Sequence, residues 1–349
     1  MKRYNNLYEK IVEYPNIELA HINAQKGKKH YTSVKKINKD QDRYLKELQT
    51  MLVNKTFKNS EYDTFIKRGK KDRLIYRLPY FPDRVVQHAI MNIVEPIWKK
   101  TLIRDTYSAI KKRGIHDGVK RVQGFLKDTE NTQYCLKMDI KKFYPTINND
   151  ILKQIIRKKI KCKNTIWLLD EIIDSSAGVP IGNYMSQYFG NLYLDPLDHW
   201  LKEDKRIKYY ARYCDDFIVL HKDKGFLYKL KQEIFSFVEN ELDLIAKENH
   251  QIFPVKSRGI DFLGYVFYHD QTRVRKDIVL TFKKKVRKIR QNWKCMQYTQ
   301  IVNTIMSYWG WLKHADAFNL WKKYIDDEIK MIMQIVCNDQ KINNPLKEI

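Results

Sequence analysis

Two adjacent acids interrupt a run of strand-forming residues, the sequence YYARYCDDFIVL at positions 209–220. Aromatic and β-branched residues favour strands, so this segment predicts a strand, a tight turn and a second strand. Asp215 and Asp216 then share the turn, where like charges repel and burial beside apolar strands requires a compensating cation. A divalent metal ion would meet that requirement. The alternative is a surface turn in which Asp serves only as a turn former.

A second predicted strand adds a third acid. In residues 134–140, Leu136, Met138 and Ile140 alternate with other residues, which places Asp139 on the opposite face of a half-buried strand. Oxygen ligands on neighbouring strands could hold two Mg²⁺ ions about 4 Å apart. That arrangement activates a 3′-hydroxyl and stabilises a leaving pyrophosphate in nucleotidyl transfer.

Two further segments predict amphipathic helices. Apolar residues recur at helical spacing in residues 84–100 and again in residues 225–244. Internal repeats and low-complexity tracts are not visible, and loop signals are scattered singly along the chain. We therefore expect interwoven domains without long linkers.

The charge balance indicates a polyanionic partner. The 66 Lys and Arg residues exceed the 41 Asp and Glu residues, which gives a net charge of +25 at pH 7. Such an excess suits nucleic acid or an acidic membrane surface. The longest uncharged stretches, residues 175–194 and 295–312, are interrupted by polar residues, so we expect no membrane-spanning segment. The five cysteines form no C-x-x-C pair and no secretory signal is visible, so we expect a reduced, cytoplasmic protein.

The order of these segments resembles that of reverse transcriptases. Asp139 lies in the first palm motif of that family, residues 178–187 (GVPIGNYMSQ) resemble the second, and residues 213–216 (YCDD) match the Y-x-D-D box. Residues 78–89 (LPYFPDRVVQHA) and 258–265 (RGIDFLGY) resemble further blocks before and after the palm motifs. Five ordered blocks are a far more specific signal than a lone Y-x-D-D.

The resemblance covers about residues 60–315 and implies an α+β right-hand polymerase fold with fingers, palm and thumb. We expect an antiparallel palm sheet that carries the catalytic acids, and a helical thumb. The expected domains are an N-terminal segment with the fingers at 1–133, the palm at 134–268 with a helical finger insertion at about 150–177, and the thumb with a C-terminal helix at 269–349.

The activity that the resemblance implies is RNA-directed DNA polymerisation, in which template RNA is copied into cDNA from dNTPs. By resemblance, Asp139, Asp215 and Asp216 are catalytic and bind two Mg²⁺ ions together with the backbone carbonyl of Ile140. Mn²⁺ could substitute for Mg²⁺. Tyr144 lies where relatives place a bulky side chain that clashes with a ribose 2′-hydroxyl, unless it is an ordinary core aromatic.

One departure from the family pattern narrows the subfamily. Retroviral and group II intron enzymes usually carry Q-G-x-x-x-S-P, whereas this chain has I-G-x-x-x-S-Q from Ile181 to Gln187. The substitution is similar to that in diversity-generating retroelement enzymes, in which an apolar residue at this position is associated with error-prone copying of template adenines. An aliphatic side chain removes polar contacts near the incoming nucleotide. The alternative is that Ile181 is a packing residue.

The resemblance also implies contacts to nucleotide and nucleic acid. The residues expected at the incoming nucleotide are Lys71, Arg73, Arg77, Tyr144, Ile181, Gly182 and Gln187. Among the three cations, Lys71 and Arg73 are the first choices, and Arg77 is the alternative if the alignment with the family motif is shifted. Those expected at the template and primer are Arg113, Gly114, Lys283, Lys284, Arg287, Lys288 and Arg290. Each cation alone could instead be a solvated charge on an amphipathic helix or loop. The proton donor to pyrophosphate stays open between Lys247 and His250.

Partners and alternatives follow from the same resemblance. Diversity-generating relatives work with a small basic accessory protein and a structured template RNA, so both are expected here, as is a higher-order complex. An antiphage defence reverse transcriptase that copies a dedicated noncoding RNA is the alternative within the fold. A catalytically idle RNA-binding scaffold is the alternative from another class. The three acids argue against a scaffold, which has no need of uncompensated acids in a basic cleft.

Overall fold

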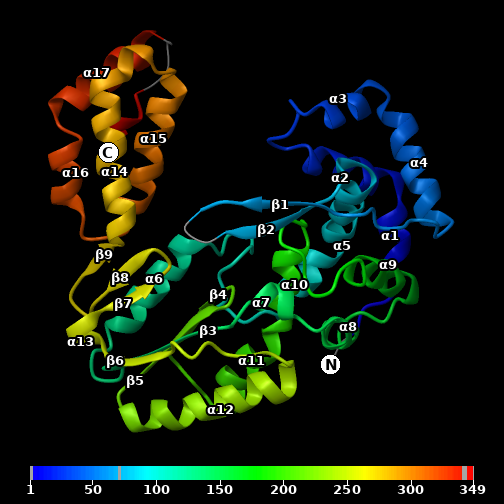
Figure 1. Cartoon of the computed structure of the whole chain (residues 1–349), viewed down its shortest axis with the longest axis horizontal. Helices are drawn as coiled ribbons and strands as arrows, with labels where there is room; N and C mark the ends of the chain where they lie inside the picture. The colour runs from blue at the N-terminus through cyan, green and yellow to red at the C-terminus, as the bar shows by residue number, and fades with distance from the viewer. Residues whose placement is uncertain (1–2, 70–71, 340–343, 349) are drawn as a thin grey trace. The chain divides into compact units, whose positions relative to one another are not determined.

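The computed structural model describes residues 3–69, 72–339 and 344–348 of the chain. The chain divides into two compact units, each assembled from separated segments (Figure 1). The first unit comprises residues 1–111, 138–217 and 229–250, and the second comprises residues 112–137, 218–228 and 251–349. The predicted division into fingers, palm and thumb stays a prediction. No helix within the described ranges is long and apolar enough to cross a membrane.

Helices dominate the first unit. In chain order they are α1 (Tyr8–Val12), α2 (Tyr14–Ala24), α3 (Thr32–Lys39), α4 (Gln41–Val53), η1 (Tyr80–Arg84), α5 (Val85–Thr101), α7 (Phe143–Thr146), α8 (Asn149–Arg157), α9 (Lys163–Ile173), α10 (Ser186–Tyr193), α11 (Asp195–His199) and η2 (Trp200–Asp204). Apolar side chains three or four positions apart explain these helices. For example, α4 buries Leu45, Leu48 and Leu52.

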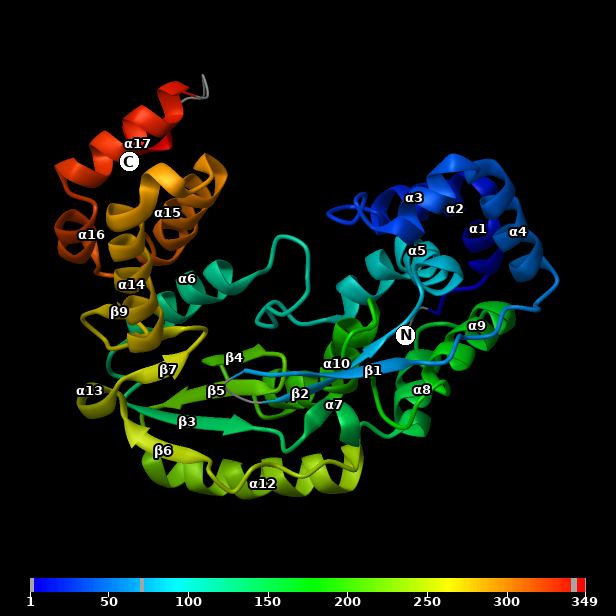
Figure 2. The same cartoon turned by 45° about the horizontal axis from the view of Figure 1, so that its top comes forward.

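Helix α5 confirms the helix predicted at residues 84–100. It buries Val85, Val86 and Ala89, and the N-terminal helices α1 and α2 pack against it (Figure 2). The second predicted helix is confirmed as α12 (Lys224–Leu242), which begins in the second unit and continues into the first.

Within the described ranges, the strands form three separate sheets. They are β1 (Asp63–Lys67), β2 (Arg73–Arg77), β3 (Tyr134–Asp139), β4 (Tyr210–Tyr213), β5 (Asp216–His221), β6 (Gln251–Pro254), β7 (Ile260–Phe262), β8 (Tyr265–Phe267) and β9 (Thr272–Val274). The sheet that carries the predicted acids has the order β4-β5-β3-β6, and β3 pairs antiparallel with β6 in the register Cys135↔Phe253. Strands β1 and β2 form an antiparallel hairpin, and β7, β8 and β9 form an antiparallel sheet in chain order.

The strand–turn–strand prediction at residues 209–220 is confirmed by β4 and β5, and the predicted strand at 134–140 is confirmed by β3. The face predicted to be buried in β3 is buried, because Leu136 and Met138 are almost completely covered. In β5, Phe217 and Ile218 are likewise covered. These apolar strands hold the acidic turn on a rigid support.

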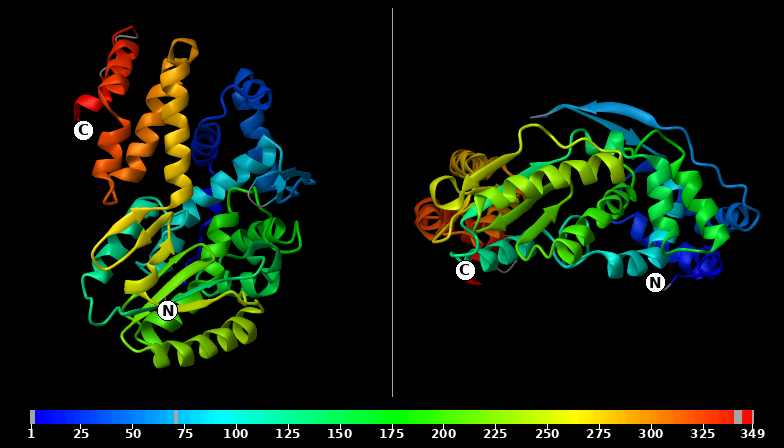
Figure 3. Two further views of the ribbon diagram at one scale, coloured as in Figure 1. Left: turned by 60° about the vertical axis from the view of Figure 1, so that its left-hand side comes forward. Right: turned by 90° about the horizontal axis from the view of Figure 1, so that it is seen from below.

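The second unit contains a helical group in its C-terminal part. Its helices are α6 (Ile115–Leu126), α13 (Val255–Arg258), α14 (Lys276–Asn292), η3 (Trp293–Cys295), α15 (Tyr298–Leu312), α16 (Phe318–Tyr324), α17 (Asp327–Asp339) and η4 (Pro345–Glu348). Helices α14 and α15 lie side by side (Figure 3), and Phe282, Val286 and Ile289 form the buried stripe of α14. Helix α6 packs against β8.

Gly264, in the turn between β7 and β8, provides a test of this packing. Its φ is +85°, and a Cβ added there would lie 2.6 Å from Cζ3 of Trp311. Gly264→Ala should therefore lower the free energy of unfolding by about 2 kcal/mol or more, through left-handed strain and overpacking. Chemical denaturation followed by circular dichroism measures this change.

Gly124→Ala is the matched control, because Gly124 lies in α6 and a Cβ there would meet nothing within 4 Å. We expect that variant to gain about 0.5–1 kcal/mol, since alanine is the better helix former. A Gly264→Ala protein as stable as the wild type would contradict the described packing.

Candidate active site

The acidic turn joins β4 to β5. Cys214 follows the last residue of β4 and has a φ of +59°, the left-handed region that residues with a side chain rarely adopt. Asp215 comes next, and Asp216 begins β5. Both acids are half-buried. The turn therefore combines two costly features, a left-handed cysteine and two covered carboxylates, which the surroundings must stabilise.

Asp139 and Asp215 are the two acids that the structure brings together. Asp139 ends β3, and its carboxyl group lies close enough to that of Asp215 for its charge to act on the Asp215 carboxyl. Burial, and then the charge of Asp139, raise the pKa of Asp215 to about 7. No cluster of three or more Asp, Glu, His or Cys side chains arranged to hold a metal ion occurs in the described part of the chain. Asp216 therefore does not complete a three-acid cluster in this arrangement.

Lys247 compensates the acidic pair. Its Nζ forms an ion pair with Oδ2 of Asp139, and its backbone N–H donates to the Asp139 carbonyl oxygen at 2.9 Å. An antiparallel bridge between Ile140 and Ala246 aligns the two segments. His250, the other sequence candidate for the proton donor, instead has Nε2 3.3 Å from Nζ of Lys231. Of the two candidates, Lys247 is the one that contacts Asp139.

The acidic pair fits a hard divalent cation. Oδ1 of Asp139 is buried and has no hydrogen-bond partner among the described residues. Two neighbouring carboxyl groups repel each other when both are ionised, and a cation relieves that repulsion. Carboxylate oxygen is also the ligand type that Mg²⁺ prefers. Asp139 and Asp215 could therefore hold such an ion once the Lys247 ammonium group moves aside.

Tyr144 lies beside the acidic turn. Its hydroxyl group is 2.8 Å from Sγ of Cys214, and burial raises its pKa. Gly190 of α10 allows this placement, because a Cβ there would already lie 3.1 Å from Cε1 of Tyr144. The residue predicted to exclude a 2′-hydroxyl thus contacts the Y-x-D-D turn directly.

Ile181 and Gly182 contact the β1–β2 hairpin through the backbone. The Tyr76 N–H donates to the Ile181 carbonyl oxygen at 2.8 Å. Gly182 has a φ of +132°, and a Cβ there would lie only 2.2 Å from the Tyr76 carbonyl oxygen, so this close approach requires glycine. Ile181 is half-buried, whereas Gln187 is exposed on the first turn of α10.

The predicted phosphate-gripping cations have different surroundings. Arg73 is exposed at the start of β2. Arg77, at the end of β2, forms an ion pair with Asp63 of β1. Lys71 lies outside the described residues. The structure thus leaves Arg73 better placed than Arg77 for an external phosphate group, because Arg77 already has a carboxylate partner.

The nucleic-acid candidates lie in the second unit. Arg113 is half-buried, and Gly114 is the N-cap of α6. On α14, Lys284, Arg287 and Lys288 are exposed.

Two further candidates on α14 have internal partners. Lys283 lies over the ring of Tyr324, and Arg290 forms ion pairs with Asp326 and Glu328. Lys288 also lines a groove of about 760 Å³ along α14 and α15. The exposed cations suit a phosphate backbone, whereas Arg290 stabilises its own unit.

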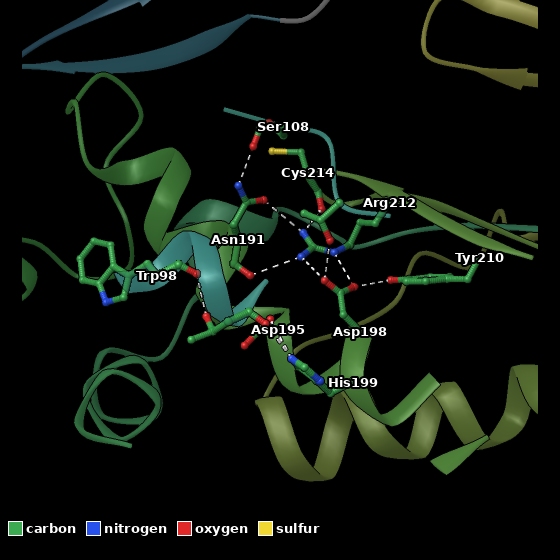
Figure 4. A network of polar contacts seen from close by, with 11 residues as sticks. Trp98, Ser108, Asn191, Asp195, Asp198, His199, Tyr210, Arg212 and Cys214 are labelled. Atoms are coloured by element: carbon green, nitrogen blue, oxygen red, sulfur yellow. Dashed lines mark hydrogen bonds and ion pairs between the residues drawn. The ribbon is translucent and has the colours of Figure 1, made fainter. Parts of the chain in front are cut away.

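Arg212 is a central residue that the sequence analysis did not identify. It is completely buried in β4, and its guanidinium group donates from Nε to Oδ1 of Asp198 at 2.7 Å and from Nη1 to the Cys214 carbonyl oxygen at 2.9 Å (Figure 4). Tyr210 also donates to Oδ1 of Asp198, at 2.5 Å, and Asn191 accepts from Arg212. The sequence contains one indication of this network. Arg212 lies on the same strand face as the largely apolar Tyr210, where a charged residue is uncommon.

The fold and the paired acids define a right-hand polymerase, as predicted. The chain matches the reverse transcriptase (RNA-dependent DNA polymerase) family over residues 66–267, more than half of its length, and it belongs to that family. The apo telomerase from Candida tropicalis has a similar fold, with a TM-score of 0.50 and 16% identity over 84% of this chain and 62% of that one.

Relatives of known sequence are distant. Protein YkfC of Escherichia coli (strain K12) is 23% identical over 241 residues, which cover 56% of this chain and 63% of YkfC. The group II intron-encoded protein LtrA of Lactococcus lactis subsp. cremoris is 21% identical over 295 residues, which cover 64% of this chain and 48% of LtrA. The chain thus spans between about half and two thirds of the length of these relatives.

The raised pKa of Asp215 predicts a pH-dependent stability in metal-free protein. Folding raises this pKa from 3.8 to about 7, so between those values the folded state binds a proton that the unfolded chain lacks. The stabilisation is present at low pH and is lost as the pH rises through the folded pKa. In EDTA, the unfolding free energy of the wild type should fall between about pH 4 and about pH 7 relative to that of Asp215→Asn, and should level off at higher pH.

Urea denaturation across this range measures the difference. Asp150→Asn is the control, because the Asp150 side chain is 83% exposed on α8. Parallel pH curves for the wild type and Asp215→Asn would show that Asp215 does not titrate as described.

Proposed function

We propose that this chain is an RNA-directed DNA polymerase that copies a structured template RNA into cDNA by two-metal nucleotidyl transfer. The observation that carries the proposal is the convergence of Asp139 and Asp215 at the ends of two strands, within the part of the chain that matches the reverse transcriptase family. Two neighbouring, half-buried carboxyl groups have no structural benefit that would offset their repulsion. They are explained by a reaction that needs a bound cation.

In this proposal, Asp139, Asp215, Asp216 and the Ile140 carbonyl group hold two Mg²⁺ ions, or Mn²⁺ in their place. The bound ions would activate the primer 3′-hydroxyl and neutralise charge on the leaving pyrophosphate. Lys247, which now neutralises Asp139, would be released and could donate a proton to pyrophosphate. The Tyr144 ring, held at the turn by Cys214, would crowd a ribose 2′-hydroxyl and so favour dNTPs.

The cations complete the proposed substrate site. Lys71 and Arg73 would contact the triphosphate of the incoming nucleotide, with Arg77 as the alternative. Lys284, Arg287 and Lys288 on α14 would contact the phosphate backbone of the template–primer duplex, with Arg113 and Gly114 near the template. The net charge of +25 supports both contacts. Partner proteins, including a small basic accessory protein, would join a larger complex.

We further propose that synthesis is error-prone, as in diversity-generating retroelements. Ile181 supports this proposal, since its aliphatic side chain is half-buried at the point where the hairpin meets the Gly182 backbone. An aliphatic residue there cannot hydrogen-bond to the nucleotide, which leaves the base less constrained. The alternative role is antiphage defence, in which a dedicated noncoding RNA is the template.

Primer extension by purified protein on matched RNA and DNA templates tests the function. Synthesis that requires Mg²⁺ and is lost in the Asp215→Ala/Asp216→Ala double variant supports a polymerase. Products with many changes opposite adenine support diversification, and faithful or repetitive products support defence. RNA binding without synthesis, in the presence of cognate RNA and accessory protein, would support the idle scaffold.

Asp139→Ala and Asp215→Ala should each reduce synthesis by roughly 10³-fold or more, because stabilisation of developing charge by bound metal contributes most of the catalysis in such reactions. Affinity for template–primer should change little, since the proposed phosphate contacts lie on other residues. Filter binding and single-turnover extension measure the two effects. Asp150→Ala, on the exposed face of α8, is the control. An equal loss of binding and synthesis would count against the assigned roles.

Ile181→Gln should reduce misincorporation opposite template adenine, because an amide restores a polar contact at the nucleotide. Sequencing of extension products measures the error spectrum. Ile66→Gln is the control, since Ile66 lies in the hairpin and is 63% exposed. An unchanged spectrum in Ile181→Gln would identify Ile181 as a packing residue.

A further inference from the structure

We infer that Arg212 is a positioning residue for the metal-binding acids, and that it acts through the backbone of Cys214. This inference rests on the proposed function, since it concerns how the same acids are held. Among the described residues, the hydrogen bonds of the Arg212 side chain go to Asp198, Asn191 and Cys214, and none goes to Asp139 or Asp215. Its guanidinium group contacts the turn through the Cys214 carbonyl oxygen, at 2.9 Å.

The Cys214 carbonyl group controls the direction of Asp215. That carbonyl belongs to the planar peptide unit that joins Cys214 to Asp215, so a hydrogen bond to it fixes the orientation of the whole unit. Cys214 has a φ of +59°, which the chain would not adopt without support. By holding this peptide unit, Arg212 fixes where the Asp215 carboxyl group points relative to Asp139.

The rest of the guanidinium group is held by two elements, α10 and α11. Nη2 donates to Oδ2 of Asp198 at 2.5 Å and to the Asn191 carbonyl oxygen at 3.3 Å, and Nη1 reaches Oδ1 of Asn191 at 3.3 Å (Figure 4). Asp198 also accepts hydrogen bonds from the hydroxyl groups of Tyr210 and Thr106. The network therefore ties the turn to α10, α11 and the segment before α6.

A purely structural role would not require this chemistry. Arg212 and Asp198 are both fully buried, and burying two charges is costly compared with a well-packed apolar pair. The strand itself is held without the side chain, because the Arg212 N–H donates to the Asp105 carbonyl at 2.9 Å and its carbonyl accepts from Tyr107 at 3.1 Å. What the guanidinium group adds is a planar fork that contacts a carboxylate and the turn carbonyl at once.

Arg212→Lys separates the two roles. Lysine keeps a positive charge near Asp198 but is a point charge that cannot reproduce the fork of hydrogen bonds. Groups that orient metal ligands typically change metal affinity or activity by about 10- to 100-fold when they are replaced. We therefore expect Arg212→Lys to weaken Mn²⁺ binding by a factor in that range and to lower kcat similarly. The KM for dNTP and the affinity for template–primer should stay within about threefold.

Electron paramagnetic resonance titration of the full chain with Mn²⁺ alone measures binding without any need for synthesis. The Mn²⁺ binding that is lost in Asp139→Ala defines the site. Arg157→Lys is the matched control, because Arg157 forms an ion pair with Asp170 at 2.5 Å, between α8 and α9. That variant should bind Mn²⁺ like the wild type. Absence of synthesis in the wild type would count against the proposed function, whereas the Mn²⁺ titration would still report on Arg212.

Tyr210→Phe keeps the test decisive if Arg212→Lys does not fold. It removes one hydrogen bond to Asp198 without changing any charge, so we expect a smaller loss of Mn²⁺ affinity in the same direction. A loss of Mn²⁺ affinity in the folded variants, but not in Arg157→Lys, supports the inference. Lower melting temperatures with wild-type Mn²⁺ binding in every variant that folds would overturn it and leave Arg212 as a structural residue.

Discussion

Repulsion between two carboxyl groups at the ends of neighbouring strands is the constraint on which the site depends. Asp139 and Asp215 lie close together, and their half-buried position reduces the screening of their charges by water. Protonation of one carboxyl group, a neighbouring lysine or a bound metal ion would each relieve the repulsion. The protein shows the first two, since the pKa of Asp215 is raised and Lys247 contacts Asp139. The bound metal ion is what we propose, because the chain belongs to the reverse transcriptase family.

The surroundings of the turn show how a fold keeps an unfavourable arrangement in place. Buried apolar strands support the turn, and polar contacts fix the orientation of its peptide groups. Arg212 holds the peptide unit after Cys214, while the Cys214 side chain contacts Tyr144. The same turn thus links the proposed metal ligands to the residue proposed to select the sugar. On another side of the site, the backbone of Gly182 packs directly against the backbone of the β1–β2 hairpin.

Local patterns in the sequence predicted β3, the β4–β5 hairpin and helices α5 and α12, because alternation and helical spacing are properties of short segments. Contacts between distant segments were harder to predict. Lys247 approaches Asp139, 108 positions away in the sequence, because a β-bridge joins Ile140 to Ala246. The ion pair of Arg290 with Asp326 likewise depends on how the helices pack. Arg212 was missed because a strand of four residues gives little pattern from which to recognise a buried charge.

X-ray diffraction from crystals of the chain with template–primer, a non-hydrolysable dNTP and Mn²⁺ would test the central claim most directly. Anomalous scattering locates Mn²⁺ independently of any assumption about the reaction. We predict Mn²⁺ peaks between the Asp139 and Asp215 carboxyl groups, with the Lys247 ammonium group displaced from Asp139. Bound nucleotide with no Mn²⁺ at these acids, and Lys247 still paired with Asp139, would contradict the account.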